Sequence, residues 1–175
     1  MQILIDAYEA IRDFLELGGP VLRVIAIVIL LMWILILERL IYFNTSLKSV
    51  IARTLSEWEQ RHERQSWEAH QIRTAMISRV REQANKGLAM IQTLVALCPL
   101  FGLLGTVTGM VAVFQVMAAT GAGNARSMAD GVSMATVPTM AGMVGMLSGI
   151  FLVTVLTRMM RRRVGLLEDE MTMDH

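Results

Sequence analysis

The fold of this chain is decided by CPLFGLLGTVTGM, residues 98–110, and by ATVPTMAGMVG, residues 135–145. Each segment lies inside a long stretch, residues 87–125 and residues 131–157, that contains no Lys, Arg, Asp, Glu or His. A helix of about 20 apolar residues crosses the hydrocarbon core of a bilayer. Both stretches are therefore predicted to contain transmembrane helices.

Small residues recur in both segments at positions where contact with lipid would favour leucine. Helices in lipid associate through close backbone contact and interhelical hydrogen bonds, so such residues indicate tight helix packing. Their steps of three and four residues place them on one side of each helix. They are Gly102, Gly105, Thr106 and Gly109 in the first segment, and Thr139, Gly142, Gly145 and Gly149 in the second.

The composition supports a membrane protein, because 54% of the 175 residues are hydrophobic and only 18% are charged. We predict an all-α membrane protein with three transmembrane helices, two of them extended into the cytoplasm, and an N-terminal amphipathic helix. Nothing points to a nucleic-acid-binding face. The histidines at 62, 70 and 175 lack metal-ligand spacing, and the single Cys98 is expected to be a buried apolar side chain. Neither a metal nor a cofactor is predicted.

The first third of the chain is predicted to contain two helices. Residues 1–20 form an amphipathic helix with an acidic face, ended by Gly18-Gly19-Pro20. Residues 21–43 form the first transmembrane helix, although the uncharged core between Arg23 and Glu38 also fits a buried or re-entrant segment.

The central segment, residues 44–90, is charged and carries apolar residues at helical spacing. This pattern predicts two amphipathic helices that continue the membrane helices into water, with a turn near His62 to Ser66. The second transmembrane helix is assigned to residues 91–117.

A polar link over residues 118–130 and a third transmembrane helix over residues 131–157 follow. Ser127 and Asp130 match an N-terminal capping box, which predicts a helix start near Met128. The tail, residues 158–175, opens with four arginines between Arg158 and Arg163. Such a cluster anchors a helix end at the membrane surface, and specific recognition of lipid is the alternative.

The basic residues indicate the topology, because cytoplasmic loops carry the excess of Lys and Arg. Residues 44–90 contain eight, the tail contains four and the link contains one. Three spans then place the N-terminus and the link in the periplasm, and the central segment and the tail in the cytoplasm. Both basic regions thereby share one side of the membrane.

The chemistry of the two uncharged stretches excludes the usual forms of catalysis, because their hydroxyls have no acid or base beside them. No enzyme activity is predicted. Thr106 and Thr139 are candidates to line an ion pathway, although threonines in membrane helices also bond the carbonyl four residues earlier and merely pack. Because threonine does not titrate at physiological pH, a proton pathway here requires a partner chain that brings a membrane carboxylate.

The motif from Gly102 to Met110, supported by Thr139 to Gly142, resembles the MotA/TolQ/ExbB proton-channel family. Three spans and a compact cytoplasmic part resemble ExbB or TolQ more than MotA. An ExbB-type resemblance implies an inner-membrane motor subunit. It would form a pentamer around an ExbD-type dimer whose aspartate takes the proton, and would use the proton motive force to energise a TonB-type protein for outer-membrane uptake of iron chelates or cobalamin. A TolQ-like role in envelope maintenance and a passive assembly scaffold are the alternatives.

The resemblance also assigns individual residues. Thr106 and Thr139 match the family's pore-lining threonines. The glycines are expected to be surfaces on which like subunits pack around the partner; they are Gly102, Gly105, Gly109, Gly142 and Gly145. Several ExbB proteins have a glutamate five residues before the third-span threonine, where this chain has Met134.

Overall fold

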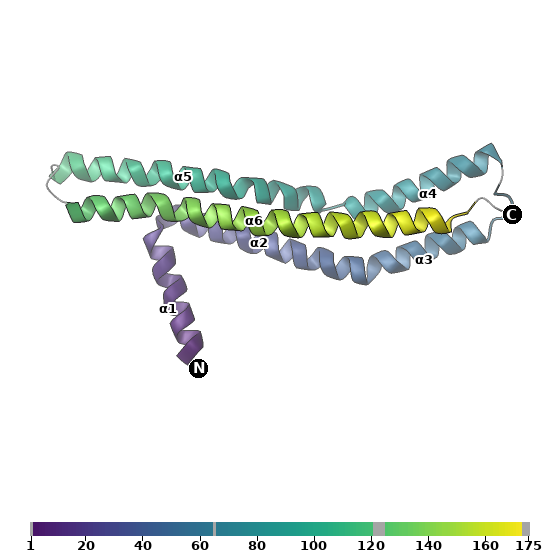
Figure 1. The fold of residues 1–175 in the computed structure, drawn as a ribbon, viewed down its shortest axis with the longest axis horizontal. Helices are drawn as coiled ribbons and strands as arrows, with labels where there is room; N and C mark the ends of the chain where they lie inside the picture. Colours follow the sequence, from purple (N-terminus) through teal and green to yellow (C-terminus); the bar gives the residue numbers. More distant parts are fainter. Residues whose placement is uncertain (1, 65, 121–124, 173–175) are drawn as a thin grey trace. The chain divides into compact units, whose positions relative to one another are not determined.

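The computed structural model describes residues 2–64, 66–120 and 125–172, and all regular secondary structure in these ranges is helical (Figure 1). The six helices are α1 (Gln2–Leu17), α2 (Gly19–Asn44), α3 (Ser46–Glu59), α4 (Trp67–Asn85), α5 (Leu88–Thr120) and α6 (Ala125–Glu170). Three segments within them are long and apolar enough to cross a membrane. The predicted all-α fold with three spans is confirmed.

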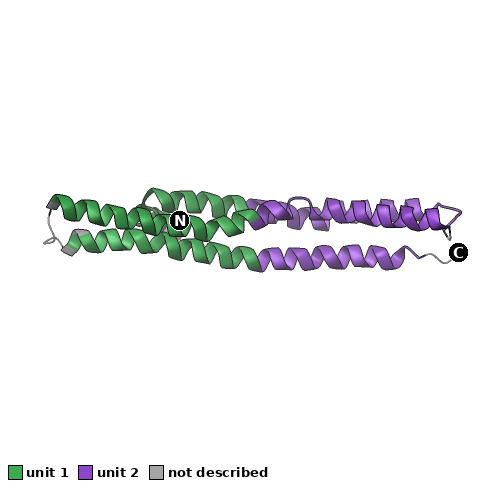
Figure 2. Ribbon diagram, turned by 90° about the horizontal axis from the view of Figure 1, so that it is seen from above, with its two compact units in different colours: residues 1–33, 93–150 green, residues 34–92, 151–175 purple. Residues whose placement is uncertain are grey.

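The chain divides into two compact units, which are coloured separately in Figure 2. Unit 1 comprises residues 1–33 and 93–150, and unit 2 comprises residues 34–92 and 151–175. The helices α2, α5 and α6 contribute residues to both units.

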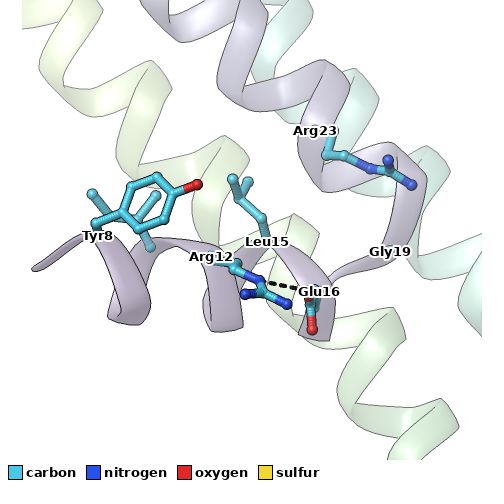
Figure 3. Close-up of a pocket in the computed structure, with 7 residues that line it drawn as sticks. Tyr8, Arg12, Leu15, Glu16, Gly19 and Arg23 are labelled. Atoms are coloured by element: carbon cyan, nitrogen blue, oxygen red, sulfur yellow. Dashed lines mark hydrogen bonds and ion pairs between the residues drawn. The ribbon is translucent and has the colours of Figure 1, made fainter. Parts of the chain in front are cut away.

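In unit 1, α1 ends at Leu17 and only Gly18 separates it from α2, so the helix ends at the predicted Gly18-Gly19-Pro20 segment, whose last two residues open α2. Gly19 has a φ of +65°, a conformation that side chains disfavour, and Pro20 lies in the first turn of α2, where its missing N–H costs no helical hydrogen bond. A pocket of about 450 Å³ lies at this junction (Figure 3). Arg12 and Glu16 pair on its α1 side, with Nε and Oε1 3.1 Å apart, and Arg23 belongs to α2.

In unit 2, the helices α3 and α4 are joined by a loop between Glu59 and Trp67, which confirms the predicted turn near His62 to Ser66. Ser66 caps α4, because its hydroxyl accepts a hydrogen bond from the Ala69 amide at 3.1 Å. The Ser66 N-cap is a local sequence signal for the start of α4 that the prediction of the turn did not use.

The amphipathic helices α3 and α4 continue the membrane helices α2 and α5, as predicted, with a break of one or two residues at each junction. Thr45 separates α2 from α3, and Lys86 and Gly87 separate α4 from α5. Gly87 has a φ of +86°, and a Cβ there would lie 2.7 Å from Nε of Arg39. The Arg39 guanidinium also lies 5.2 Å from the centre of the Tyr42 ring. The helical spacing of the apolar residues in the charged segment does not indicate these breaks.

The helix α6 is longer at both ends than predicted. It begins at Ala125, so Ser127 lies inside the helix and the predicted start near Met128 is wrong. Alanine and arginine are good helix formers, so a capping-box pattern after them does not have to start the helix. Residues 118–120 and 125–130 of the predicted link are also helical.

The C-terminal end of α6 is held by side chains of α3 and α4. The Trp58 indole donates a hydrogen bond to the Thr172 carbonyl at 3.1 Å. Arg73 donates through Nε to the Met171 carbonyl at 2.7 Å and through Nη2 to the Glu168 carbonyl at 2.5 Å. These bonds satisfy carbonyls that a helix end leaves without intrahelical partners.

Candidate functional site

The helices α5 and α6 approach to near backbone contact in unit 1. A Cβ added to Gly142 would lie 2.5 Å from the Cys98 carbonyl oxygen and 3.3 Å from Cα of Gly102. A Cβ added to Gly102 would lie 3.1 Å from Cα of Thr139. Glycine at these positions is therefore required by the packing of one helix backbone on the other.

Two further glycines of α5 lie in close contact with residues of α6. The ring of Pro138 packs against Gly105, where an added Cβ would lie 2.8 Å from Cγ of the proline. At Gly109 an added Cβ would lie 2.5 Å from Cα of Ala135. The Pro138 ring therefore occupies the space that Gly105 leaves on the surface of α5, which gives this proline a packing role.

The glycines of α6 also contact α2. A Cβ added to Gly145 would lie 2.7 Å from Cδ1 of Ile29 and 3.5 Å from Sγ of Cys98. A Cβ added to Gly149 would lie 2.7 Å from Sδ of Met32. These glycines thus pack within one chain; that like subunits also pack on them around a partner stays a prediction. Cys98 is buried, as predicted.

The two candidate threonines meet at the α5–α6 contact. The hydroxyl oxygens of Thr106 and Thr139 are 2.5 Å apart, and both residues are half-buried. The Thr139 hydroxyl also donates to the Gly102 carbonyl of α5 at 2.9 Å. The fold therefore joins two residues that are 33 positions apart in the sequence into one polar cluster.

Other hydroxyls in the membrane helices bond their own helix. Thr108 donates to the Gly105 carbonyl at 3.0 Å, and Ser148 donates to the Gly145 carbonyl at 2.8 Å. Thr106 lies 3.4 Å from the Gly102 carbonyl of its own helix, a longer contact than the one with Thr139. The interpretation that the threonines bond only their own helix therefore does not hold for this pair.

The number of hydrogens limits how many hydrogen bonds the threonine pair forms at one time. Each hydroxyl carries one hydrogen and two lone pairs. The Gly102 carbonyl accepts from one of the two hydroxyls, Thr139 at 2.9 Å or Thr106 at 3.4 Å, and the other hydroxyl then donates across the contact between them. Either arrangement leaves a lone pair on the Thr106 oxygen that is able to accept a hydrogen bond from a further O–H group.

Met134, where several ExbB proteins have glutamate, lies away from the direct hydrogen bonds of the threonine pair. It is half-buried and lines a pocket of about 500 Å³ with Ser133 and three carboxylates, Asp13, Glu16 and Asp130. Its methyl group also approaches Gly19, where an added Cβ would lie 3.1 Å from Cε. Carboxylates from α1 and from the start of α6 therefore lie near this position.

Residues 43–171 match the model of the MotA/TolQ/ExbB proton channel family. The chain belongs to this family. Together with the three apolar helices, the match makes the chain a multi-pass membrane protein of a proton-channel family. This confirms the family that the glycine and threonine motif resembled.

Individual relatives match over shorter regions. The biopolymer transport protein exbB1 of Vibrio cholerae is 41% identical over 64 residues, which cover 36% of this chain and 28% of the relative. An ExbB-like biopolymer transport protein of Synechocystis sp. is 33% identical over 82 residues, which cover 45% of this chain and 32% of the relative. The matched region thus spans about a third of each relative's length.

The sequence did not show which residues of α2 face the bundle. The buried positions are Leu22, Ile25, Val28, Met32, Ile36 and Phe43, most of them at helical spacing. Residues between them, such as Ile27 and Leu30, are exposed in the single chain and equally apolar. Because lipid and protein both favour apolar side chains, the hydrophobic pattern carries no signal for this face.

Proposed function

We propose that this chain is an ExbB-type inner-membrane motor subunit that forms a pentameric proton channel around an ExbD-type partner. It would use the proton motive force to energise a TonB-type protein for outer-membrane transport of iron chelates or cobalamin. The hydrogen-bonded pair of Thr106 and Thr139 is the observation that carries the proposal. The names of the similar proteins, which describe biopolymer transport, favour an ExbB-type role.

The partner is required by the chemistry of the site. Residues 87–125 and 131–157 contain no side chain that exchanges a proton at physiological pH. The carboxyl group of an aspartate in the partner's membrane helix would supply the proton-carrying group. The proposed topology has a periplasmic N-terminus and a cytoplasmic C-terminus, and protons would move from the periplasmic to the cytoplasmic side of the membrane.

The threonine pair is able to form a hydrogen bond with such an aspartate in either of its charge states. A protonated carboxyl group donates its hydrogen to a free lone pair of Thr106, whereas an ionised carboxylate accepts the hydrogen of Thr106 after that hydroxyl turns away from its acceptor within the chain. The pair thereby replaces water for a charged group in a region where an unpartnered charge is costly. One charge that moves through about 100 mV releases about 2.3 kcal/mol, which is enough to shift a two-state element.

The experiment is a proton-flux measurement on the complex of this chain with its ExbD-type partner, reconstituted in liposomes. The variants Thr106→Val and Thr139→Val keep the side-chain shape and remove the hydroxyl. Each is expected to reduce flux at least about tenfold, because a charge-assisted hydrogen bond contributes about 1.5–3 kcal/mol. Thr108→Val is the matched control, since the Thr108 hydroxyl bonds only its own helix at Gly105.

Assembly with the partner is checked for each variant, so that loss of the complex is separated from loss of flux. Full flux in assembled Thr106→Val and Thr139→Val complexes would refute the proposed pathway. The chain reconstituted without a partner is expected to conduct no protons, and robust current from it would also contradict the proposal.

A further inference from the structure

Unit 2 contains a cleft of about 590 Å³ between α4, the start of α5 and the last third of α6. It combines two arginines with neutral hydrogen-bonding groups and one carboxylate. The polar side chains that line it are Arg81, Arg161, Asn85, Gln92, Thr157 and Glu168.

The charges in the cleft leave one cation without an ion-pair partner in the cleft itself. Arg81 lies 3.6 Å from the Glu168 carboxylate, so these two charges offset each other. Arg161 is exposed and lines the same cleft. The cleft therefore carries a net positive charge, beside amide and hydroxyl groups that donate hydrogen bonds to an anion.

The position of the cleft along the helices favours a lipid over a soluble anion. Thr157 is the last residue of the uncharged stretch of α6, and Arg158 follows it. Gln92 lies five residues after Gly87, where the uncharged stretch of α5 begins. The polar groups of the cleft thus lie where the apolar part of each helix gives way to charged residues, the depth at which phospholipid headgroups are found.

Gly165 keeps part of the cleft open. It lines the cleft, and a Cβ built on it would meet no atom within 4 Å. The glycines of the α5–α6 contact in unit 1 differ, because an added Cβ at each would meet a neighbouring helix. Packing between helices therefore does not explain glycine at this position, whereas a ligand headgroup that fills the space would.

We propose that this cleft binds the phosphodiester headgroup of an anionic phospholipid. Arg161 pairs with the phosphate, and the space beside Gly165 holds the polar headgroup. This assignment is independent of the proton pathway, since it uses none of the threonine pair.

The test uses the full-length chain in detergent. Native mass spectrometry measures retention of dioleoyl phosphatidylglycerol and of dioleoyl phosphatidylcholine, which have the same acyl chains and differ in net headgroup charge. Arg161→Gln removes the proposed phosphate contact. Gly165→Leu fills the cleft without changing any charge. Arg162→Gln is the matched control, because Arg162 is exposed on the same helix and does not line the cleft.

The wild-type chain is expected to retain phosphatidylglycerol at least about tenfold more strongly than phosphatidylcholine. Arg161→Gln is expected to weaken retention about tenfold, the effect of losing one charge-assisted hydrogen bond. Gly165→Leu is also expected to weaken it about tenfold, because its side chain would occupy the space of the headgroup. Arg162→Gln should change it less than about twofold.

Four results would overturn the assignment. Equal retention of the two lipids, or equal losses in Arg161→Gln and Arg162→Gln, would mean that no specific headgroup site exists. Unchanged retention in Gly165→Leu would place the lipid outside this cleft. Displacement of phosphatidylglycerol by millimolar inorganic phosphate would identify the ligand as a soluble anion.

Discussion

Replacing Gly142 by alanine should open the contact between α5 and α6. The new Cβ would lie 2.5 Å from the Cys98 carbonyl oxygen, whereas ordinary contacts begin at 3.4 Å. The obstacle is backbone, so no side chain can turn away to make room. The two helices must separate by about 0.9 Å, the difference between these distances. The same shift would lengthen the Thr139–Gly102 hydrogen bond from 2.9 Å to about 3.8 Å and break it.

The free-energy change follows from these terms. Overpacking of a close contact costs about 1–3 kcal/mol, and the lost hydrogen bond costs about 1 kcal/mol. The better helix propensity of alanine offsets up to about 1 kcal/mol. The net destabilisation is therefore roughly 1–3 kcal/mol, and the population of opened molecules should rise between about fivefold and about 150-fold.

Cys98 provides the assay, because it is the single cysteine of the chain and is fully buried beside Gly142. Its reaction with a fluorogenic maleimide in detergent measures the population of opened molecules when reclosing is faster than labelling. Gly165→Ala is the matched control, since it makes the same chemical change in the same helix where an added Cβ meets nothing. Equal labelling rates in Gly142→Ala and Gly165→Ala would refute the proposed contact.

Three further predictions concern other parts of the chain. Trp58→Phe removes the indole donor to the Thr172 carbonyl and should lower stability by about 1 kcal/mol, with faster hydrogen exchange at the end of α6. Trp67→Phe changes a side chain that is 76% exposed and should change neither stability nor hydrogen exchange. Equal effects of Trp58→Phe and Trp67→Phe would contradict the role of Trp58 in holding the end of α6. Gly87→Ala places a side chain at a φ of +86° and should cost about 1–2 kcal/mol or more in thermal unfolding, so an unchanged midpoint would argue against the strained turn. Met134→Leu should preserve assembly with the proposed partner and proton flux through the complex, and lost flux in an assembled complex would reveal a role for this position.

The membrane helices were predictable from the sequence because their physical signal is local. Long uncharged stretches identify the spans, and the spacing of small residues identifies the sides on which α5 and α6 pack. The partner of each glycine was not predictable, since it depends on the register between helices. Gly142 faces Cys98 and Gly102 within the same chain, and no local pattern separates this from packing between subunits.

The contact between Thr106 and Thr139 was likewise not predictable from the sequence. Each residue was a candidate because a hydroxyl is unusual within an apolar span. Their direct contact, however, follows from the antiparallel alignment of α5 and α6 and from the close approach that Gly102 and Gly142 permit. The bond between Trp58 and Thr172 likewise joins residues 114 positions apart. Such contacts become visible only when the helices are placed side by side.

The central claim is that the hydroxyls of Thr106 and Thr139 act as one hydrogen-bonded unit in proton flux. A double-mutant cycle on these two residues, with proton flux as the readout, tests it most directly. The complex with the proposed ExbD-type partner is reconstituted in liposomes, and flux is compared for the wild type, Thr106→Val, Thr139→Val and the double variant. If the two hydroxyls act as one hydrogen-bonded unit, each single variant loses at least about tenfold and the double variant loses little more than either. Independent effects that multiply in the double variant, or flux at the wild-type level in all four complexes, would contradict the account.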